Sequence, residues 1–215
     1  MLEGETFFSE TDREAISSAI KLAEAKTAGE IAVMVVGQSD TYPEGIILGG
    51  AMIGSLLALA VTDLLGFGSQ WVYVPCAVLC TLFVGVGLKR MPSLHRLFIP
   101  EGRLESLVRR RAEQAFFEQG LHRTRDASGV LFFLSCFERK VWVLADYGIY
   151  QKIDPVTLQA HADRVVQGVK GGRQAQALCA EIARVGEVLA RHFPIRPDDA
   201  NELSDRVIIE TTSRP

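Results

Sequence analysis

The sequence predicts an α/β domain with a small mixed central sheet, interrupted by a two-helix transmembrane hairpin. Residues 46–88 contain one charged residue, Asp63, although 23% of the 215 residues are charged. The positive mean hydropathy of +0.16 agrees with apolar residues gathered in one stretch. On either side of that stretch, helical and strand-like hydrophobic patterns follow one another, which is typical of an α/β domain.

Two apolar runs, Ile46–Leu65 and Trp71–Leu88, match a transmembrane helix in length. A helix rises about 1.5 Å per residue, so about 20 residues cross the ~30 Å hydrocarbon core of a bilayer. Turn-forming residues dominate the connector 66–70. The first run carries small residues on one side: Gly49, Gly50, Gly54 and Ser55. Such residues let two membrane helices pack closely. A buried core hairpin of a soluble protein is the alternative, but the stretch lacks an amphipathic pattern.

Positive charge is concentrated after the second run. The flanking cations are Lys89, Arg90, Arg96, Arg103 and Arg109–Arg111, whereas the connector 66–70 has no Lys or Arg. The positive-inside rule therefore places both soluble segments in the cytoplasm. We expect a multi-pass protein of the cell inner membrane with two spans, for which the lipid bilayer is one partner. Two spans leave too little protein to line a transport pathway.

The segment before the hairpin predicts a helix and then a strand. Ser9 is a candidate N-cap, and Asp12 completes a variant of the capping box. We expect Gly29 to end the helix with a left-handed cap. Ile31–Val36 is β-branched and apolar throughout, which predicts a strand buried on both faces.

The segment after the hairpin predicts a helix at Arg103–Gln119 and two strands, Gly129–Cys136 and Lys140–Ala145, joined as a β-hairpin. Asp154-Pro155 combines an N-cap with proline at the first helical position, and opens a helix to about Gly168.

A last helix follows and runs to about His192, and the tail from Pro197 onward is expected to be loosely ordered. The predicted organisation is one α/β domain in two parts, residues 1–45 and 89–193, with the hairpin at 46–88 and a polar C-terminal tail at 194–215.

Four motifs in the soluble part carry a family resemblance. They are residues 26–33, 121–131, 138–141 and 145–149. In this order and spacing the chain resembles the TPM domain family, in its bacterial membrane-anchored branch with an inserted transmembrane hairpin. Phe193-Pro194 followed by Asn201-Glu202-Leu203 is similar to the ending of that branch. The resemblance implies a Rossmann-like sandwich with a central sheet of about four strands.

The resemblance implies little about chemistry. Some relatives are associated with phosphatase activity or divalent-metal binding, and others with assembly or repair of membrane complexes. Two motifs depart from the family pattern. The usual Asp-Asn-Gly-Val turn reads Asp126-Ala127-Ser128-Gly129 here, and the usual Gly-Tyr-Gly reads Asp146-Tyr147-Gly148. Both changes weaken the transfer of a family site to this chain.

The candidate ligand residues are carboxylates next to the predicted strands. Asp126 and Asp146 could converge at one end of the sheet, with Asp154 and Glu30 nearby. Turn formation and helix capping explain these aspartates, and a Ca²⁺ or Mg²⁺ site is the alternative. The sequence has no D-x-D pair, no Gly-rich phosphate loop and no G-x-S-x-G elbow, so no catalytic residue is assigned.

Arg109, Arg110 and Arg111 allow two interpretations. They are either a solvated helix face or, because their helix follows the membrane segment, a contact for acidic lipid headgroups.

The predicted function is that of a membrane-anchored binding module that assists assembly or quality control of a membrane protein complex. A divalent-metal-dependent phosphatase-like hydrolase is the alternative. No cofactor is assigned beyond the candidate Ca²⁺ or Mg²⁺. The net charge of −3 argues against nucleic acid as a partner, so we expect a membrane protein instead.

Overall fold

The fold is that of a computed structural model, which describes residues 7–66, 69–196 and 206–210. The chain divides into two compact units. One unit combines Met1–Asp40 with Glu105–Pro215, and the other is Thr41–Leu104. One compact unit is thus built from two separate stretches of chain, with the other unit inserted between them.

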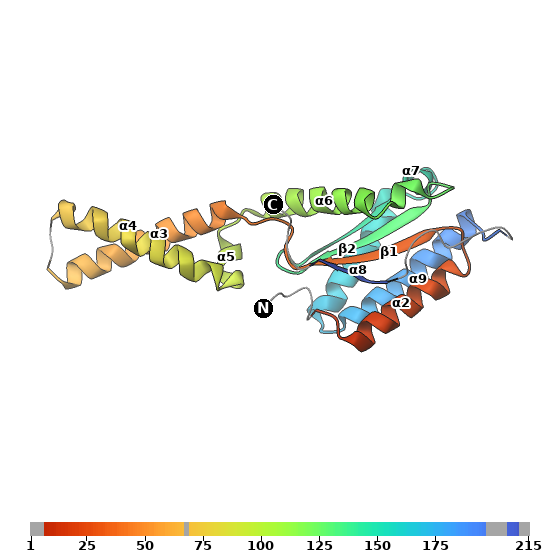
Figure 1. The fold of residues 1–215 in the computed structure, drawn as a ribbon, viewed down its shortest axis with the longest axis horizontal. Helices are drawn as coiled ribbons and strands as arrows, with labels where there is room; N and C mark the ends of the chain where they lie inside the picture. Colours follow the sequence, from red (N-terminus) through yellow and green to blue (C-terminus); the bar gives the residue numbers. More distant parts are fainter. Residues whose placement is uncertain (1–6, 67–68, 197–205, 211–215) are drawn as a thin grey trace. The chain divides into compact units, whose positions relative to one another are not determined.

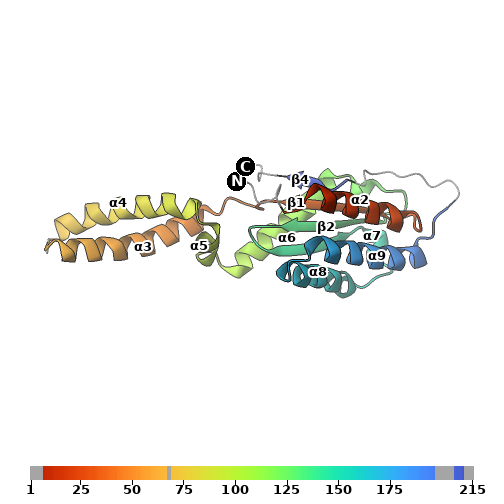
Figure 2. The same ribbon diagram turned by 90° about the horizontal axis from the view of Figure 1, so that it is seen from below.

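The inserted unit is a helical hairpin of α3 (Pro43–Leu64) and α4 (Gln70–Lys89), followed by the short α5 (Pro92–Leu97). Both long helices are long and apolar enough to cross a membrane. Large apolar side chains point outward from them, such as Leu56, which is 68% exposed, and Phe83, which is 78% exposed. An exposed apolar surface of this extent is typical of a membrane or protein interaction surface. Figure 2 shows the two helices lying side by side.

Small residues form the contact between α3 and α4, as predicted. A Cβ atom on Gly54 would lie 2.5 Å from the Cα of Thr81, and one on Gly50 would lie 3.1 Å from the Thr81 carbonyl oxygen. Gly49 instead packs against Leu88 and Phe98. The backbones of the two helices therefore approach more closely than any larger residue on α3 would permit.

The other unit is built on a four-stranded mixed sheet. Its strands are β1 (Glu30–Val36), β2 (Gly129–Ser135), β3 (Lys140–Ala145) and β4 (Ile208–Glu210), in the order β3-β2-β1-β4. β1 is parallel to both β2 and β4, and β3 is antiparallel to β2. The sheet thus joins β1, which precedes the hairpin, to β2, which follows it.

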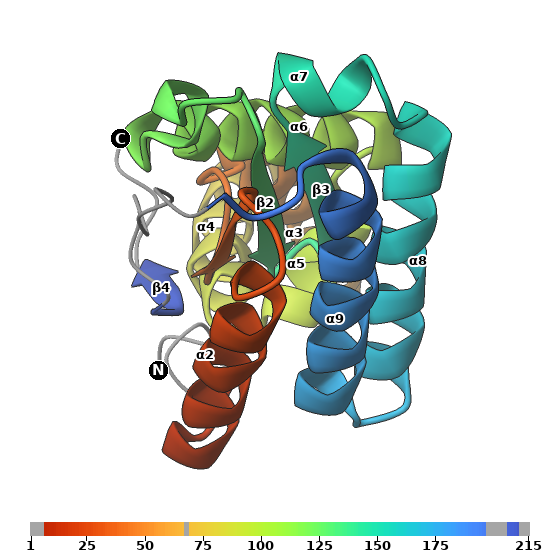
Figure 3. The same cartoon turned by 90° about the vertical axis from the view of Figure 1, so that its right-hand side faces the viewer.

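Helices cover both faces of the sheet, which makes a three-layer sandwich (Figures 1 and 3). The helix α6 (Glu101–Glu118) covers one face. The other face is covered by three helices: α2 (Glu10–Glu24), α8 (Pro155–Lys170) and α9 (Gln174–His192). Side chains of β1 alternate between the two cores, with Val33 and Val35 on the three-helix side and Met34 on the α6 side. This two-sided burial explains the uninterrupted apolar run of the strand.

Two predicted helix starts are confirmed. The Ser9 hydroxyl accepts a hydrogen bond from the Asp12 N–H at 3.1 Å, and the Asp12 carboxylate accepts one from the Ser9 N–H at 3.0 Å. Asp154 caps α8 ahead of proline at its first turn.

The predicted cap at Gly29 is wrong, because α2 already ends at Glu24 with a right-handed cap at Ala25. A Cβ on Gly29 would lie 3.0 Å from Leu189 and 3.3 Å from the Ser128 carbonyl, so close packing favours glycine there.

The prediction of a loosely ordered tail is wrong for Ile208–Glu210. These residues form β4 and pair with β1, with Met34 opposite Ile208 and Val36 opposite Glu210. The Glu210 carboxylate also forms an ion pair with Arg111 on α6. The rest of the predicted tail, including the Asn201-Glu202-Leu203 motif, lies outside the described residues.

Candidate functional site

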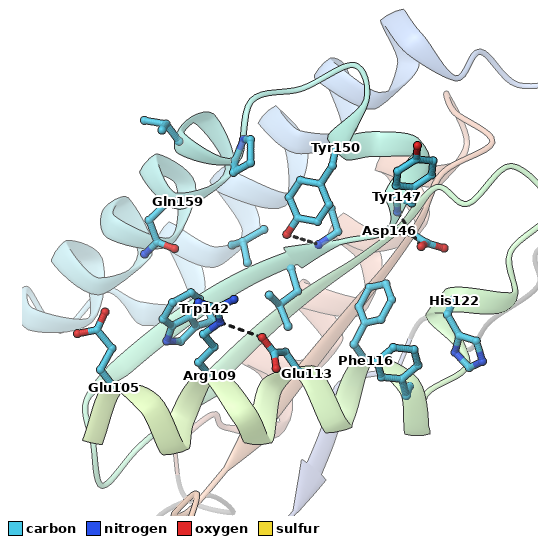
Figure 4. A pocket seen from close by; sticks show the side chains of 16 residues that line it. Glu105, Arg109, Glu113, Phe116, His122, Trp142, Asp146, Tyr147, Tyr150 and Gln159 are labelled. Carbon is cyan, nitrogen blue, oxygen red and sulfur yellow. Dashed lines mark hydrogen bonds and ion pairs between the residues drawn. The ribbon is translucent and has the colours of Figure 1, made fainter. Parts of the chain in front are cut away.

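A groove of about 830 Å³ runs along β3, the strand at one edge of the sheet (Figure 4). Residues of α6 form one side of it and the start of α8 forms part of the other. The short helix α7 (Tyr147–Tyr150) and the 3-10 helix η1 (Leu121–Arg123) contribute side chains at one end. This volume lies within the range of small-molecule and peptide pockets, about 300–1,000 Å³.

Along β3, the backbone N–H and C=O groups of alternate residues point away from β2. The Asp146 N–H donates to the Gly129 carbonyl at 2.9 Å, which makes residues 129 and 146 a hydrogen-bonded pair. In an antiparallel ladder such pairs alternate with pairs whose N–H and C=O groups point away from the partner strand. The β3 residues whose backbone N–H and C=O groups point away from β2 are therefore Val141, Val143 and Ala145. Within the described residues, the sheet has no strand beyond β3.

One of these outward N–H groups, that of Ala145, already has a hydrogen-bond partner. The Ala145 N–H donates a hydrogen bond to the Tyr150 hydroxyl at 3.3 Å (Figure 4). This bond confirms the direction in which Ala145 points. It leaves Val141 and Val143, which are 7% and 3% exposed, as the outward-pointing residues whose N–H and C=O groups have no partner strand among the described residues.

Aromatic side chains give the groove its apolar character. The guanidinium of Arg109 lies 5.9 Å from the ring centre of Trp142, and it donates to Glu113 at 2.8 Å. At the other end, the rings of Phe117 and His122 are 5.1 Å apart. Rings of this kind provide contact area for a ligand at little cost in side-chain entropy.

Two polar atoms without a hydrogen-bond partner belong to residues that line the groove. Nδ1 of His122 and Oδ2 of Asp146 are both buried and make no hydrogen bond to the part of the chain that the structure describes. The other carboxylate oxygen of Asp146 accepts from the Tyr147 N–H at 2.7 Å. A buried polar atom without a partner costs about 1–3 kcal/mol, so a ligand that bonds to either atom would gain from it.

Three of the four candidate carboxylates lie at the same end of the sheet. Glu30 begins β1 and pairs with Gly129 of β2, Asp126 precedes β2, and Asp146 follows the antiparallel β3. Asp126 forms an ion pair with Arg196 at 3.3 Å.

The fourth candidate, Asp154, accepts a hydrogen bond from the Val156 N–H at 2.8 Å as the cap of α8. Among the described residues no group of three His, Cys, Asp or Glu side chains could hold a metal ion. The described residues therefore bring no such group together, and Ca²⁺ or Mg²⁺ binding stays a prediction.

The three consecutive arginines do not form one surface. Arg111 is 8% exposed and forms ion pairs with Glu118 and Glu210, so the expectation that it contacts lipid headgroups is wrong. Arg109 lines the groove beside Trp142, and Arg110 is exposed. Successive residues on a helix point about 100° apart, which is why neighbours in sequence have different surroundings.

Comparison with known proteins shows the fold. No protein-family model matches the chain, and no curated protein matches it. Among solved structures, the chain is similar to the NMR structure of the BA42 protein from the psychrophilic bacterium Bizionia argentinensis. The TM-score is 0.59 at 19% sequence identity, and the match covers 94% of each chain. BA42 is a TPM-domain protein.

Proposed function

We propose that this chain is a membrane-anchored TPM-like module that binds an extended segment of a membrane protein and assists assembly or quality control of its complex. The four TPM-like motifs and the fold shared with BA42 support the module. The groove along β3 supports binding as its activity. No observation favours the hydrolase alternative, which needs a cluster of metal ligands.

The proposed binding mode follows from the outer edge of β3, which has no neighbouring strand among the described residues, and this is the observation that carries the proposal. An extended peptide can add to an open sheet edge through main-chain hydrogen bonds, while pockets beside the edge select its side chains. Val141 and Val143 supply the outward N–H and C=O groups. Trp142 lies between them in sequence, and its ring contributes to the wall of the groove.

The same groove could also tell one segment from another. Its polar lining combines Arg109, Glu105 and Glu113 along α6 with the unpartnered atoms of His122 and Asp146. Main-chain bonds to β3 are independent of sequence, so these side chains would determine which segment binds.

The hairpin is the proposed anchor. Helices α3 and α4 have the length and composition of transmembrane spans. Because β1 and β2 are neighbours in one sheet, the chain must return to the side of the membrane from which it left. Two crossings satisfy this requirement, and the cations after α4 favour the cytoplasm as that side.

Site-specific photo-crosslinking in native membranes tests the proposal. A photoreactive residue at Gln159, which lines the groove, should crosslink to a membrane protein that mass spectrometry can identify. Leu22 on α2 is 68% exposed and lies outside the groove, so it is the matched control position. The same crosslinked products from both positions would contradict a binding site at β3, and so would unchanged crosslinking from Gln159 in a Trp142→Ala variant.

A further inference from the structure

A second cavity, of about 670 Å³, lies at the end of β3 opposite Asp146. It is formed where the β2–β3 turn meets the end of α8 and the start of α9. Its polar lining residues are Ser135, Cys136, Arg139, Lys140, Lys170 and Gln174. We refer to it below as the basic cavity.

Two of the three cations that line the basic cavity have no balancing acid among the described residues. Three cations line it, and none of its lining residues is Asp or Glu. Lys140 has a distant partner in Glu105, at 4.0 Å. Arg139 and Lys170 form no ion pair within the part of the chain that the structure describes. An anion that approached them would be attracted by both.

The floor of the basic cavity is apolar. Val166 and Val169 on α8 and Phe7 before α2 pack against the core yet remain only partly buried. Leu134 and Val141 complete the floor from the sheet. An apolar surface next to two unbalanced cations is complementary to a molecule with an anionic head and an alkyl chain.

The backbone at Arg139 is strained. Its φ is 54°, in the left-handed region, where the turn bond from the Arg139 N–H to the Cys136 carbonyl at 3.3 Å holds it. A residue with a Cβ costs about 1–2 kcal/mol in this conformation, and glycine does not pay that cost. Strain of this kind is concentrated at functional sites.

The turn that carries Arg139 is held rigidly. Glu138 is fully buried, and its carboxylate accepts hydrogen bonds from the Ser39 N–H at 2.8 Å and from the Ser135 hydroxyl. The hydroxyls of Ser39 and Ser135 are 2.8 Å apart. These bonds fix the base of the Arg139 side chain, so the basic cavity is formed before any ligand arrives.

We propose that the basic cavity binds an anionic amphiphile, with its head on Arg139 and Lys170 and its alkyl chain on Phe7, Val166 and Val169. A free fatty acid and an anionic membrane lipid share this chemistry. The basic cavity and the β3 groove share no lining residue, although Val141 lies at the cavity floor and on the pairing edge of β3, and the proposal does not depend on the function proposed for the groove.

Cys136 is a built-in reporter of occupancy, because it lines the basic cavity and is only partly buried. We would replace Cys76, Cys80 and Cys179 by serine in the full-length protein and place it in phosphatidylcholine nanodiscs. The rate at which N-ethylmaleimide modifies Cys136 is then measured with octanoate, octanol or inorganic phosphate. At three times its Kd, octanoate should slow modification about fourfold by mass action. Octanol and phosphate should leave the rate unchanged.

Variants show whether the protection of Cys136 depends on the contact between the carboxylate of octanoate and the cations Arg139 and Lys170. In Arg139→Gln/Lys170→Gln, octanoate should no longer slow the reaction, whereas Arg173→Gln removes an exposed cation outside the cavity and should keep the protection. Circular dichroism of each variant shows that the fold is retained. Equal protection by octanol, or by phosphate, would overturn the proposal, as would protection that survives the double substitution.

The source of the ligand is assigned by changing the bilayer. Nanodiscs that contain phosphatidylglycerol should slow the modification of Cys136 without octanoate if the bilayer supplies the amphiphile. Protection by octanoate alone identifies a free fatty acid as the ligand. An unchanged rate with both octanoate and phosphatidylglycerol contradicts the proposal.

Discussion

The Tyr150 hydroxyl accepts a hydrogen bond from the backbone N–H of Ala145, at 3.3 Å, and so occupies the last outward group of strand β3. A side chain from α7 here takes the place that a neighbouring strand would otherwise fill. Of the outward-pointing residues of β3, this leaves Val141 and Val143 as those whose N–H groups have no partner strand within the described residues. An exposed strand edge is a hazard for aggregation, and shortening it is one way in which proteins limit that hazard.

Hydrogen exchange should alternate along β3. The amides of Val141 and Val143 point away from β2 and should exchange much faster than those of Trp142 and Leu144, which bond to it. NMR or mass spectrometry with residue-level fragmentation measures the rates in the full-length protein. In a Tyr150→Phe variant the Ala145 amide should become fast as well. Uniform protection along the strand would mean that another segment covers the edge.

Glu181 should make stability depend on acidic pH. It is 2% exposed, and one carboxylate oxygen lies 2.7 Å from Nδ1 of His161 and 2.8 Å from Arg164. Burial raises the pKa of this carboxyl, but the hydrogen bonds from His161 and Arg164 outweigh burial, so its pKa lies below the ordinary value. Below about pH 4.5 the unfolded chain therefore takes up a proton more readily than the folded one, and the stabilisation is lost as pH falls further.

Unfolding by urea at several pH values tests this dependence. At pH 7 the Glu181→Gln variant should be less stable by about 1–3 kcal/mol, because it weakens charge-assisted hydrogen bonds to a buried group. The difference from the wild type should shrink toward pH 3. Glu187 is exposed on the same helix, so Glu187→Gln is the control and should change neither quantity. A difference that stays constant with pH would contradict the lowered pKa.

Arg139→Gly should stabilise the protein. The substitution removes the strain of a left-handed backbone and is expected to raise the free energy of unfolding by about 1 kcal/mol. Arg173 has φ −120°, so Arg173→Gly relieves no strain and serves as the control. Urea unfolding measures both variants. If Arg139→Gly also removes the protection of Cys136 by octanoate, Arg139 lowers the stability of the protein but is needed for binding of the ligand. A loss of stability in this variant would show that the arginine side chain supports the fold.

Labelling from the two sides of the membrane tests the hairpin and its orientation. Ser69 lies in the connector between α3 and α4, and Cys136 lies in the α/β domain. In variants that carry one cysteine each, an impermeant maleimide should reach Ser69→Cys in intact spheroplasts and Cys136 only in inverted vesicles. The reverse pattern would place the α/β domain outside the cytoplasm. Labelling of both residues from one side would mean that the hairpin does not span.

Features that depend on neighbours in sequence could be predicted. The capping box of Ser9 and Asp12 and the cap at Asp154 involve residues no more than three positions apart. The hairpin follows from the length and composition of its apolar runs. The antiparallel pair β2–β3 follows from two strand patterns joined by a short turn.

Features that depend on distant pairing could not be predicted in this way. The groove lies where β3 has no neighbouring strand among residues 7–66, 69–196 and 206–210, and the strand order β3-β2-β1-β4 is set by contacts between remote segments. The strand β4 has three residues, and its partner Met34 lies far earlier in the chain. Arg111 is buried because of its rotational position on α6, whereas its sequence neighbours Arg109 and Arg110 are accessible.

The position of the hairpin also fixes an order of events during synthesis. The ribosome makes β1 first, but both strands that flank it, β2 and β4, are encoded after the hairpin. A nascent chain therefore holds an apolar strand without neighbours until α3 and α4 have been translated. In the proposed membrane-anchored protein, only a polypeptide whose hairpin has returned to its starting side can complete the sheet. Folding of the α/β domain would then report that insertion has succeeded, and a chain that inserts wrongly would leave β1 without its neighbouring strands.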